Sequence, residues 1–403
     1  MENLSADIFG RRDAMAGSNE STTPNMPDSN LAKIKVVGVG GGGGNAVERM
    51  IKSGLSGVEF YVMNTDKQVL DRSSVKEENR LQLGAKLTNG LGAGGDPQIG
   101  EKAAEEAQQE ITAALEGADM VFVTAGMGGG TGTGAAPIIA KIAKDLDILT
   151  VGVVTKPFLM EGNRRMAQAN QGLEKLKDAV DSLLVIPNEK LFEVANNKTG
   201  VQNAFVIVDE VLLRGVEGIS NIITKPGLIN VDFADVKSVM EASGSAVMGI
   251  GVGEGEGRAV EAAKIAINSS LLETSIQGAS GLIVNVTGGS DMTLFELHDA
   301  IMLIKEAVLD DAQIIIGSTI DDSRQGEISI TVIATGFDLK SQPATINQST
   351  KNDGMVPDIG TLFQPFEMPS TFGGMTENPS SITSQPQPKP FNTNIDIPDF
   401  LKK

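Results

Sequence analysis

The chemistry open to this chain is limited first by the side chains that it lacks. Among 403 residues there is no cysteine and a single histidine, His298. Thiol nucleophiles, disulfides and cysteine-ligated metals are therefore excluded. His298 lies in "TLFELHDAIMLIKEAV", whose apolar spacing predicts an amphipathic helix and a structural role for the histidine. Any reaction must depend on carboxylates, lysine, arginine, backbone dipoles or a bound metal.

Two glycine-rich runs are the strongest candidates for a binding site. Residues 40–44 are all glycine and precede "NAVERM", and residues 126–134 read "GMGGGTGTG" before "APIIAKIAKDL". Each follows an apolar run typical of a strand and opens a predicted helix, where unpaired backbone N–H groups and the helix dipole attract an anion. Thr131 and Thr133 add hydroxyl donors, and Pro137 suits a first helical turn. A third run, "NGLGAGGDP" at 89–97, could converge on the same place.

A dinucleotide site is the alternative for the first run. "GVGGGG" from Gly38 to Gly43 satisfies the pattern GxGxxG, and Asp66 follows at about the expected distance. One pyrophosphate needs one such loop, however, so two runs favour a nucleoside triphosphate. The sequence has no GxxxxGK[ST] motif, so we expect backbone N–H groups rather than a loop lysine to hold the phosphates. A nicotinamide-dependent oxidoreductase ranks below a triphosphate-binding protein.

The elements that must position these runs alternate along the chain. Strand and helix patterns alternate through residues 33–200, which predicts a nucleotide-binding α/β domain with a parallel sheet covered on both faces. A long helix over 201–224 would connect it to a second, smaller α/β domain at 225–336. Lys225-Pro226-Gly227 ends that helix. The last strands of the second domain are candidates for antiparallel pairing.

The two ends of the chain have a different composition. Residues 1–32 lack the apolar core of a signal peptide, and proline-rich residues 337–391 show no hydrophobic period, so both are predicted to be disordered. Residues 392–403 regain apolar side chains and are predicted to dock on a partner. The residues expected to make that contact are Ile395, Ile397, Pro398, Phe400 and Leu401.

Net charge and apolar content exclude two kinds of partner. The net charge of −19 argues against nucleic acid, whose phosphates are met by clustered lysine and arginine. No run of eighteen apolar residues occurs, so no membrane span is expected. A cytoplasmic protein fits these properties.

The motifs resemble those of the tubulin and FtsZ family of GTPases. "GGGTGTG" at 128–134 is similar to the family signature, and the whole run 33–336 resembles the FtsZ branch, the cell-division GTPases of bacteria. The resemblance also rests on "VGGGGGNAV", "GAGGDP", "PFLMEGNRR", "VIPNEKL", "NVDFADV" and "DIPDFLKK". It implies a Rossmann-like GTPase domain, GTP/GDP and Mg²⁺ as ligands, and head-to-tail assembly into a division ring. It also implies that the terminal peptide recruits membrane-anchoring and regulatory proteins at the division site.

The resemblance assigns roles to individual residues. Those implied to hold the phosphates are Gly41, Gly42, Gly43, Gly44, Asn45, Gly128, Gly129, Gly130, Thr131, Gly132, Thr133 and Gly134, with Ala93, Gly94 and Gly95 near the γ-phosphate. Those implied to contact ribose or guanine are Glu161, Arg165, Asn188, Phe205 and Asp209. For Glu161 and Arg165 the spacing alone indicates an i,i+4 surface ion pair equally well.

The catalytic groups are implied to come from a neighbouring subunit. In the family, the loop containing Asn230, Asp232 and Asp235 approaches the nucleotide of the next subunit, where the acids position the attacking water. Read alone, Asp232 looks like the N-cap of a helix. A scaffold that assembles without useful hydrolysis is the alternative. Asp96 and Asp209 stand where many relatives have asparagine.

Overall fold

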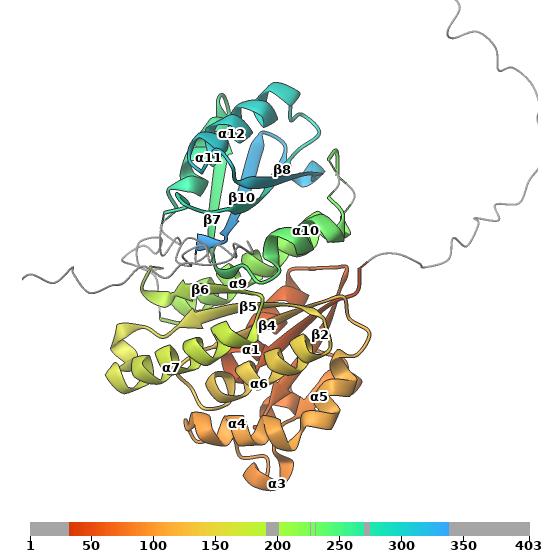
Figure 1. The fold of residues 1–403 in the computed structure, drawn as a ribbon, viewed down its shortest axis with the longest axis vertical. Helices are drawn as coiled ribbons and strands as arrows, with labels where there is room; N and C mark the ends of the chain where they lie inside the picture. The colour runs from red at the N-terminus through yellow and green to blue at the C-terminus, as the bar shows by residue number, and fades with distance from the viewer. Residues whose placement is uncertain (1–31, 191–200, 226, 230, 270–274, 338–403) are drawn as a thin grey trace, which may run out of the picture. The chain divides into compact units, whose positions relative to one another are not determined.

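The structure, a computed structural model, describes residues 32–190, 201–225, 227–229, 231–269 and 275–337 (Figure 1). The predictions for residues 1–31, for nearly all of the linker 337–391 and for the terminal peptide 392–403 lie outside the described residues, as does Asn230.

The first half of the fold is a parallel sheet of six strands, in the order β3-β2-β1-β4-β5-β6. The strands are β1 (Ile34–Val39), β2 (Val58–Asn64), β3 (Arg80–Gln82), β4 (Met120–Gly126), β5 (Leu149–Lys156) and β6 (Ser182–Pro187). The helices between them are α1 (Gly40–Lys52), α2 (Lys67–Asp71), α3 (Ala85–Thr88), α4 (Pro97–Glu106), α5 (Gln108–Leu115), α6 (Thr131–Asp145) and α7 (Asn163–Ala179). The predicted parallel α/β sheet is confirmed.

The second half continues the same sheet. Its elements are α9 (Val201–Thr224), α10 (Phe233–Met240), β7 (Gly244–Glu254), α11 (Arg258–Ile267), β8 (Gly281–Gly288), α12 (Leu294–Glu306), β9 (Gln313–Ile320) and β10 (Glu327–Thr335). β7 pairs in parallel with β6, so one sheet of ten strands runs through the described chain.

The last strand, β10, is antiparallel to its neighbours, but the predicted pairing of the last two strands with each other is wrong. The neighbours of β10 are β7 and β8, while β9 lies beyond β8 and is parallel to it. The last strand of the sheet is thus inserted between two strands made earlier.

Alternating strand residues supply both faces of the sheet with apolar side chains. On β1, Val36 faces a core that includes residues of α1, α9 and α10, whereas Val37 faces one that includes residues of α4, α6 and α7. A third core lies between α11, α12 and strands β7 to β10. Apolar side chains on both faces explain why the strand sequences read as nearly continuous apolar runs.

Two further observations concern the sequence predictions. His298 is exposed on α12, within the predicted helix. Within the described ranges, no helix is long and apolar enough to cross a membrane. The domain boundaries drawn from the sequence stay a prediction.

Candidate functional site

The two glycine runs meet at the carboxyl edge of the sheet. β1 and β4 are neighbouring parallel strands with Val39 opposite Ala125, so the runs leave the sheet side by side. A Cβ placed on Gly40 would lie 2.8 Å from the backbone nitrogen of Gly132, and one on Gly42 would lie 3.0 Å from the nitrogen of Gly126. The two loops therefore touch backbone to backbone, an approach that side chains would prevent.

The third run joins them, as its sequence predicted. A Cβ on Gly130 would lie 2.8 Å from the Cβ of Ala93 and 2.9 Å from the nitrogen of Asp96. The Asp96 side chain accepts a hydrogen bond from the nitrogen of Gln98 at 2.9 Å and so caps α4. The carboxylate that departs from the family pattern thus has a local structural role, which asparagine performs equally well.

The glycines of the first two runs fall into two groups. Some are required by the fold: a Cβ on Gly43 would lie 2.2 Å from the carbonyl oxygen of Thr124, and one on Gly134 would lie 2.0 Å from that of Pro97. At Gly41, Gly44 and Gly129, in contrast, a Cβ would meet no atom of the described residues within 4 Å, and none of these glycines has a positive φ. Neither packing nor backbone conformation demands glycine at these three positions, so their bare backbone is available to a ligand.

The two threonines of the second run serve different purposes. Thr133 is buried, and its hydroxyl oxygen accepts a hydrogen bond from the nitrogen of Gly128 at 2.8 Å, which closes the loop on itself. The Thr131 hydroxyl lies 2.6 Å from that of Thr65, the residue that follows β2. The sequence reasoning missed Thr65. Its signal was the position directly after a parallel strand, the edge where such sheets bind ligands.

Glu161 and Arg165 form the ion pair that their spacing allowed. Arg165 Nη1 lies 3.1 Å from Glu161 Oε2, and the other carboxylate oxygen accepts a hydrogen bond from the nitrogen of Phe158 at 2.8 Å. A Cβ on Gly128 would lie 2.8 Å from Arg165 Cγ, so the arginine also packs on the second glycine run. The pair therefore lies beside the second glycine run.

Asn188, Phe205 and Asp209, which the resemblance implies to contact ribose or guanine, each have a side chain that could bind a ligand. Asn188 is buried, and within the described structure its Oδ1 has no hydrogen-bond partner. Phe205 is 44% exposed and lies edge-on to Phe158 with 5.6 Å between ring centroids. On the same face of α9, burial raises the pKa of Asp209 to about 6, although the charge of Arg49 on α1 acts in the opposite direction. Each of the three side chains can thus still contact a polar, planar ligand.

The predicted catalytic acids belong to a different element. Asp232 is the N-cap of α10, and its Oδ1 accepts a hydrogen bond from the nitrogen of Asp235 at 2.9 Å. Both side chains are exposed. α10 packs on β5, β8 and β9, whereas the glycine runs begin α1 and α6. The capping role expected from the sequence is thus present, and the second oxygen of Asp232 has no hydrogen-bond partner among the described residues.

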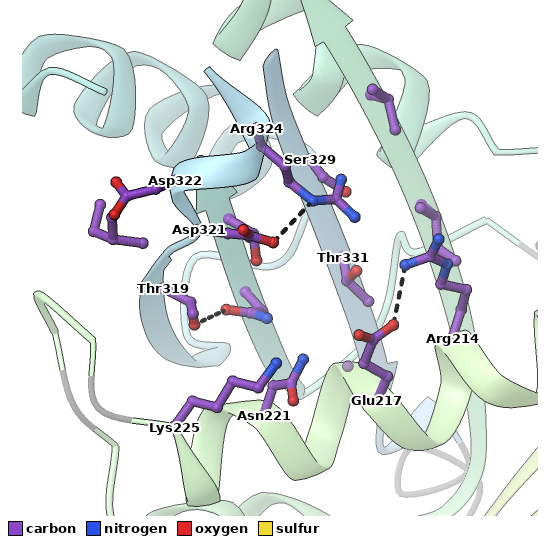
Figure 2. Close-up of a pocket in the computed structure, with 16 residues that line it drawn as sticks. Arg214, Glu217, Asn221, Lys225, Thr319, Asp321, Asp322, Arg324, Ser329 and Thr331 are labelled. Atoms are coloured by element: carbon purple, nitrogen blue, oxygen red, sulfur yellow. Dashed lines mark hydrogen bonds and ion pairs between the residues drawn. The ribbon is translucent and has the colours of Figure 1, made fainter. Parts of the chain in front are cut away.

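A separate cavity of about 400 Å³ lies between α9 and strands β7 to β10 (Figure 2). Its walls carry ion pairs, with Arg214 Nη1 3.0 Å from Glu217 Oε2 and Arg324 Nε 3.5 Å from Asp321 Oδ2. Its lining includes none of the site residues predicted from the sequence, whereas a smaller cavity of about 210 Å³ borders Gly44 and Asn45. The site predicted from the sequence therefore lies at the converging glycine runs, and the larger cavity is separate from it.

Comparison with known proteins identifies related families and structures. Residues 33–196 match the family described as "Tubulin/FtsZ family, GTPase domain", and residues 244–338 match "FtsZ family, C-terminal domain". An FtsZ dimer structure from M. jannaschii is 48% identical with a TM-score of 0.73, covering 77% of this chain and 89% of that one.

Two more distant structures share the fold. CetZ1 from Haloferax volcanii, a GDP-bound monomer, is 20% identical with a TM-score of 0.64, covering 75% of this chain and 94% of that one. CetZ2 from the same organism, a GTPgS-bound protofilament, is 22% identical with a TM-score of 0.63, covering 75% and 92%.

Proposed function

The chain belongs to the tubulin/FtsZ family as a polymerising GTPase of the FtsZ type, and from this premise we propose how its residues divide the work. One subunit binds GTP at the converging glycine runs, and the next subunit supplies Asp232 and Asp235. The observation that carries the proposal is that the binding groups gather at one edge of the sheet while these acids stand exposed on α10.

The phosphates would lie against the open backbone at Gly41, Gly44 and Gly129. Nothing else in the described chain fills the space that a Cβ would take at these positions. The helix starts of α1 and α6 contribute unpaired N–H groups and a favourable dipole. Gly94 and Gly95, exposed on the third loop, would complete the enclosure around the γ-phosphate.

Guanine and ribose would be held by the residues around α9. The Oδ1 of buried Asn188, unpaired within the described ranges, can accept a hydrogen bond, and the exposed face of Phe205 can support a base. Asp209, when ionised, accepts from the N–H groups of guanine. A base that presents an acceptor at that position would leave a half-buried carboxylate unpaired, which favours guanine.

Mg²⁺ fits this site as a partner of the triphosphate. Within the described residues no three acidic or histidine side chains gather into a metal cluster. Mg²⁺ commonly keeps several waters and binds through substrate phosphates with few protein ligands, so a site poor in ligands suits it. When bound, the ion would neutralise charge that otherwise repels an approaching carboxylate.

Asp232 and Asp235 would position the attacking water across the subunit interface. With one oxygen engaged in capping α10, Asp232 is held in a fixed orientation and presents its other oxygen outward. Hydrolysis then depends on assembly, because neither subunit holds both the nucleotide and the acids that act on it. A head-to-tail contact of this kind generates a filament when it does not close.

The deciding measurement is phosphate release from GTP against protein concentration, with and without Mg²⁺. We expect specific activity to rise steeply through the assembly range and to require the metal. A specific activity that stays flat would refute the shared site, and assembly without phosphate release would favour the nucleotide-binding scaffold.

Asp232→Asn separates catalysis from folding. Asparagine caps helices as well as aspartate, so α10 should keep its stability, whereas Asp232→Ala would also lose about 1 kcal/mol of capping. We expect Asp232→Asn to bind GTP and assemble but to hydrolyse slowly. Wild-type hydrolysis in this variant would mean that the carboxylate only caps the helix.

The filament would act in the cytoplasm at the division site. Recruitment to the membrane is assigned to the terminal peptide with Ile395, Ile397, Pro398, Phe400 and Leu401, an assignment that rests on the sequence alone. Removing residues 392–403 should leave GTP hydrolysis and assembly unchanged while abolishing localisation to the division site. Loss of assembly in the truncated chain would contradict a purely recruiting role.

A further inference from the structure

The loop that leads from α9 to Asp232 is bonded to the edge strand of the sheet. The nitrogen of Leu228 donates to the carbonyl oxygen of Ser318 at 2.9 Å, and the nitrogen of Ser318 donates to the carbonyl oxygen of Ile229 at 3.3 Å. The two segments form an isolated antiparallel bridge between Ile229 and Ser318. Ser318 lies in β9, the last strand of the ten-stranded order. The loop is therefore fixed to the sheet by backbone contacts.

Gly227 makes this approach possible. A Cβ at this position would lie 1.9 Å from the carbonyl oxygen of Ser318 and 2.9 Å from its carbonyl carbon. Gly227 does not have a positive φ, so the requirement is for space rather than for an unusual backbone conformation. Any other residue would force the loop and β9 apart.

The other end of α10 is held independently. The side-chain amide of Gln313 donates to the hydroxyl of Ser238 at 3.0 Å, and the hydroxyl of Thr335 donates to the carbonyl oxygen of Val239 at 3.0 Å. Val236, like Val239, is buried. The last turn of α10 is thus anchored to β9 and β10, so the placement of its exposed first turn depends on the loop before it.

We propose that the Gly227–Ser318 contact is a positioning device for hydrolysis, which sets how far Asp232 and Asp235 project toward the nucleotide of the neighbouring copy. The inference rests on the proposed function, because it assigns the acids to the reaction. Gly227 is a positioning residue and touches no reacting atom. An error of about 1 Å in the placement of such groups can cost about 100-fold in rate.

Gly227→Ala tests the device, with Ser318→Ala as its matched control. The added Cβ must push the loop away from β9, so we expect kcat for GTP hydrolysis to fall about 10–100-fold. The Kd for GTP, the KM and the sedimented fraction should stay within about twofold, because the glycine runs and α9 are untouched. Ser318→Ala keeps both backbone bonds and removes only a buried hydroxyl without a partner in the described structure, so it should hydrolyse like the wild type.

A disulfide lock provides a second test that does not depend on the stability of Gly227→Ala. The chain has no cysteine, so Ile229→Cys with Ser318→Cys would introduce a single reversible bond between bridge partners. A fixed positioning device requires equal hydrolysis in the oxidised and reduced forms. Loss of activity on oxidation, regained on reduction, would show that the contact opens during turnover and would overturn the inference.

The outcomes separate this inference from the proposed function. Asp232→Asn is measured in parallel: if it hydrolyses like the wild type, the assignment of the acids is wrong. If it is slow while folded Gly227→Ala hydrolyses within about twofold of the wild type, only the positioning device is wrong.

Discussion

Gly129 offers a direct test of whether the open glycines face a ligand. An alanine Cβ at this position meets no atom within 4 Å in the part of the chain that the structure describes, and the backbone there is not in the left-handed region. Gly129→Ala should therefore leave the nucleotide-free protein as stable as the wild type, or more stable by about 0.4–1 kcal/mol, because alanine restricts the unfolded chain. The same methyl group would stand where the bare backbone meets a phosphate.

The expected loss of affinity follows from one contact. Losing a single hydrogen bond to a charged phosphate oxygen costs about 1.5–3 kcal/mol, which corresponds to roughly a 10–150-fold rise in the Kd for GTP. Calorimetric titration of the nucleotide-free variant measures the Kd, and thermal unfolding without nucleotide measures the stability. The prediction is a loss of binding without a loss of melting temperature.

Gly134→Ala is the matched control with the opposite pattern. Its Cβ would lie 2.0 Å from the carbonyl oxygen of Pro97 and 2.6 Å from the nitrogen of Glu101, so α4 and α6 must separate. Overpacking of this kind costs about 1–3 kcal/mol, or roughly 2–12 °C in melting temperature. The reasoning is refuted if Gly129→Ala binds GTP within about twofold of the wild type, or if it melts well below the wild type.

Two further predictions concern charge and pH. Because burial raises the pKa of Asp209 to about 6, the affinity for GTP should fall as the pH drops through 6. Asp209→Asn should flatten this pH dependence. If the variant keeps the wild-type pH profile in a titration series, Asp209 takes no part in base recognition. Arg258 is buried and bonds Asp291 Oδ2 at 2.6 Å and Glu296 Oε1 at 2.7 Å, which lowers the pKa of both carboxyls. A lowered carboxyl pKa stabilises the fold above about pH 4, and this contribution is lost as the pH falls below it. Arg258→Met should therefore lower the free energy of unfolding at pH 7 and have a much smaller effect in acid, as measured by urea unfolding.

The sequence was sufficient for the fold class because the strands are buried on both faces. A continuous apolar run, such as the one that contains Val36 and Val37, indicates a strand of a parallel sheet even when the order of the strands is unknown. The position of β10 between β7 and β8 could not be predicted, since pairing across a sheet depends on contacts between residues far apart in the chain. The alternation of Ile328 and Ile330 with polar residues is compatible with several neighbours.

For the candidate site, the spacing of residues located the glycine runs. It could not distinguish the glycines that packing requires from those that face open space. Gly41 and Gly43 look alike in sequence, yet one faces open space and the other lies against Thr124. Thr65 escaped notice because its contact with Thr131 joins two loops that only the parallel register brings together. The Oδ1 of Asn188, which has no partner among the described residues, could not be identified from the sequence either, since a missing partner is a property of three-dimensional packing.

The insertion of β10 between β7 and β8 has a consequence for synthesis of the chain. The six parallel strands are complete once Pro187 has been made, but β7 and β8 gain their common neighbour only when Thr335 has been added. β8 is complete at Gly288, and at a typical rate of about 5–20 residues per second the stretch from Gly288 to Thr335 takes roughly 2–9 s. During that time the nascent chain carries two apolar strands with unpaired edges, which are templates for association with other chains. The C-terminal half is therefore the part of this protein whose ribosome-bound intermediates most need protection from aggregation.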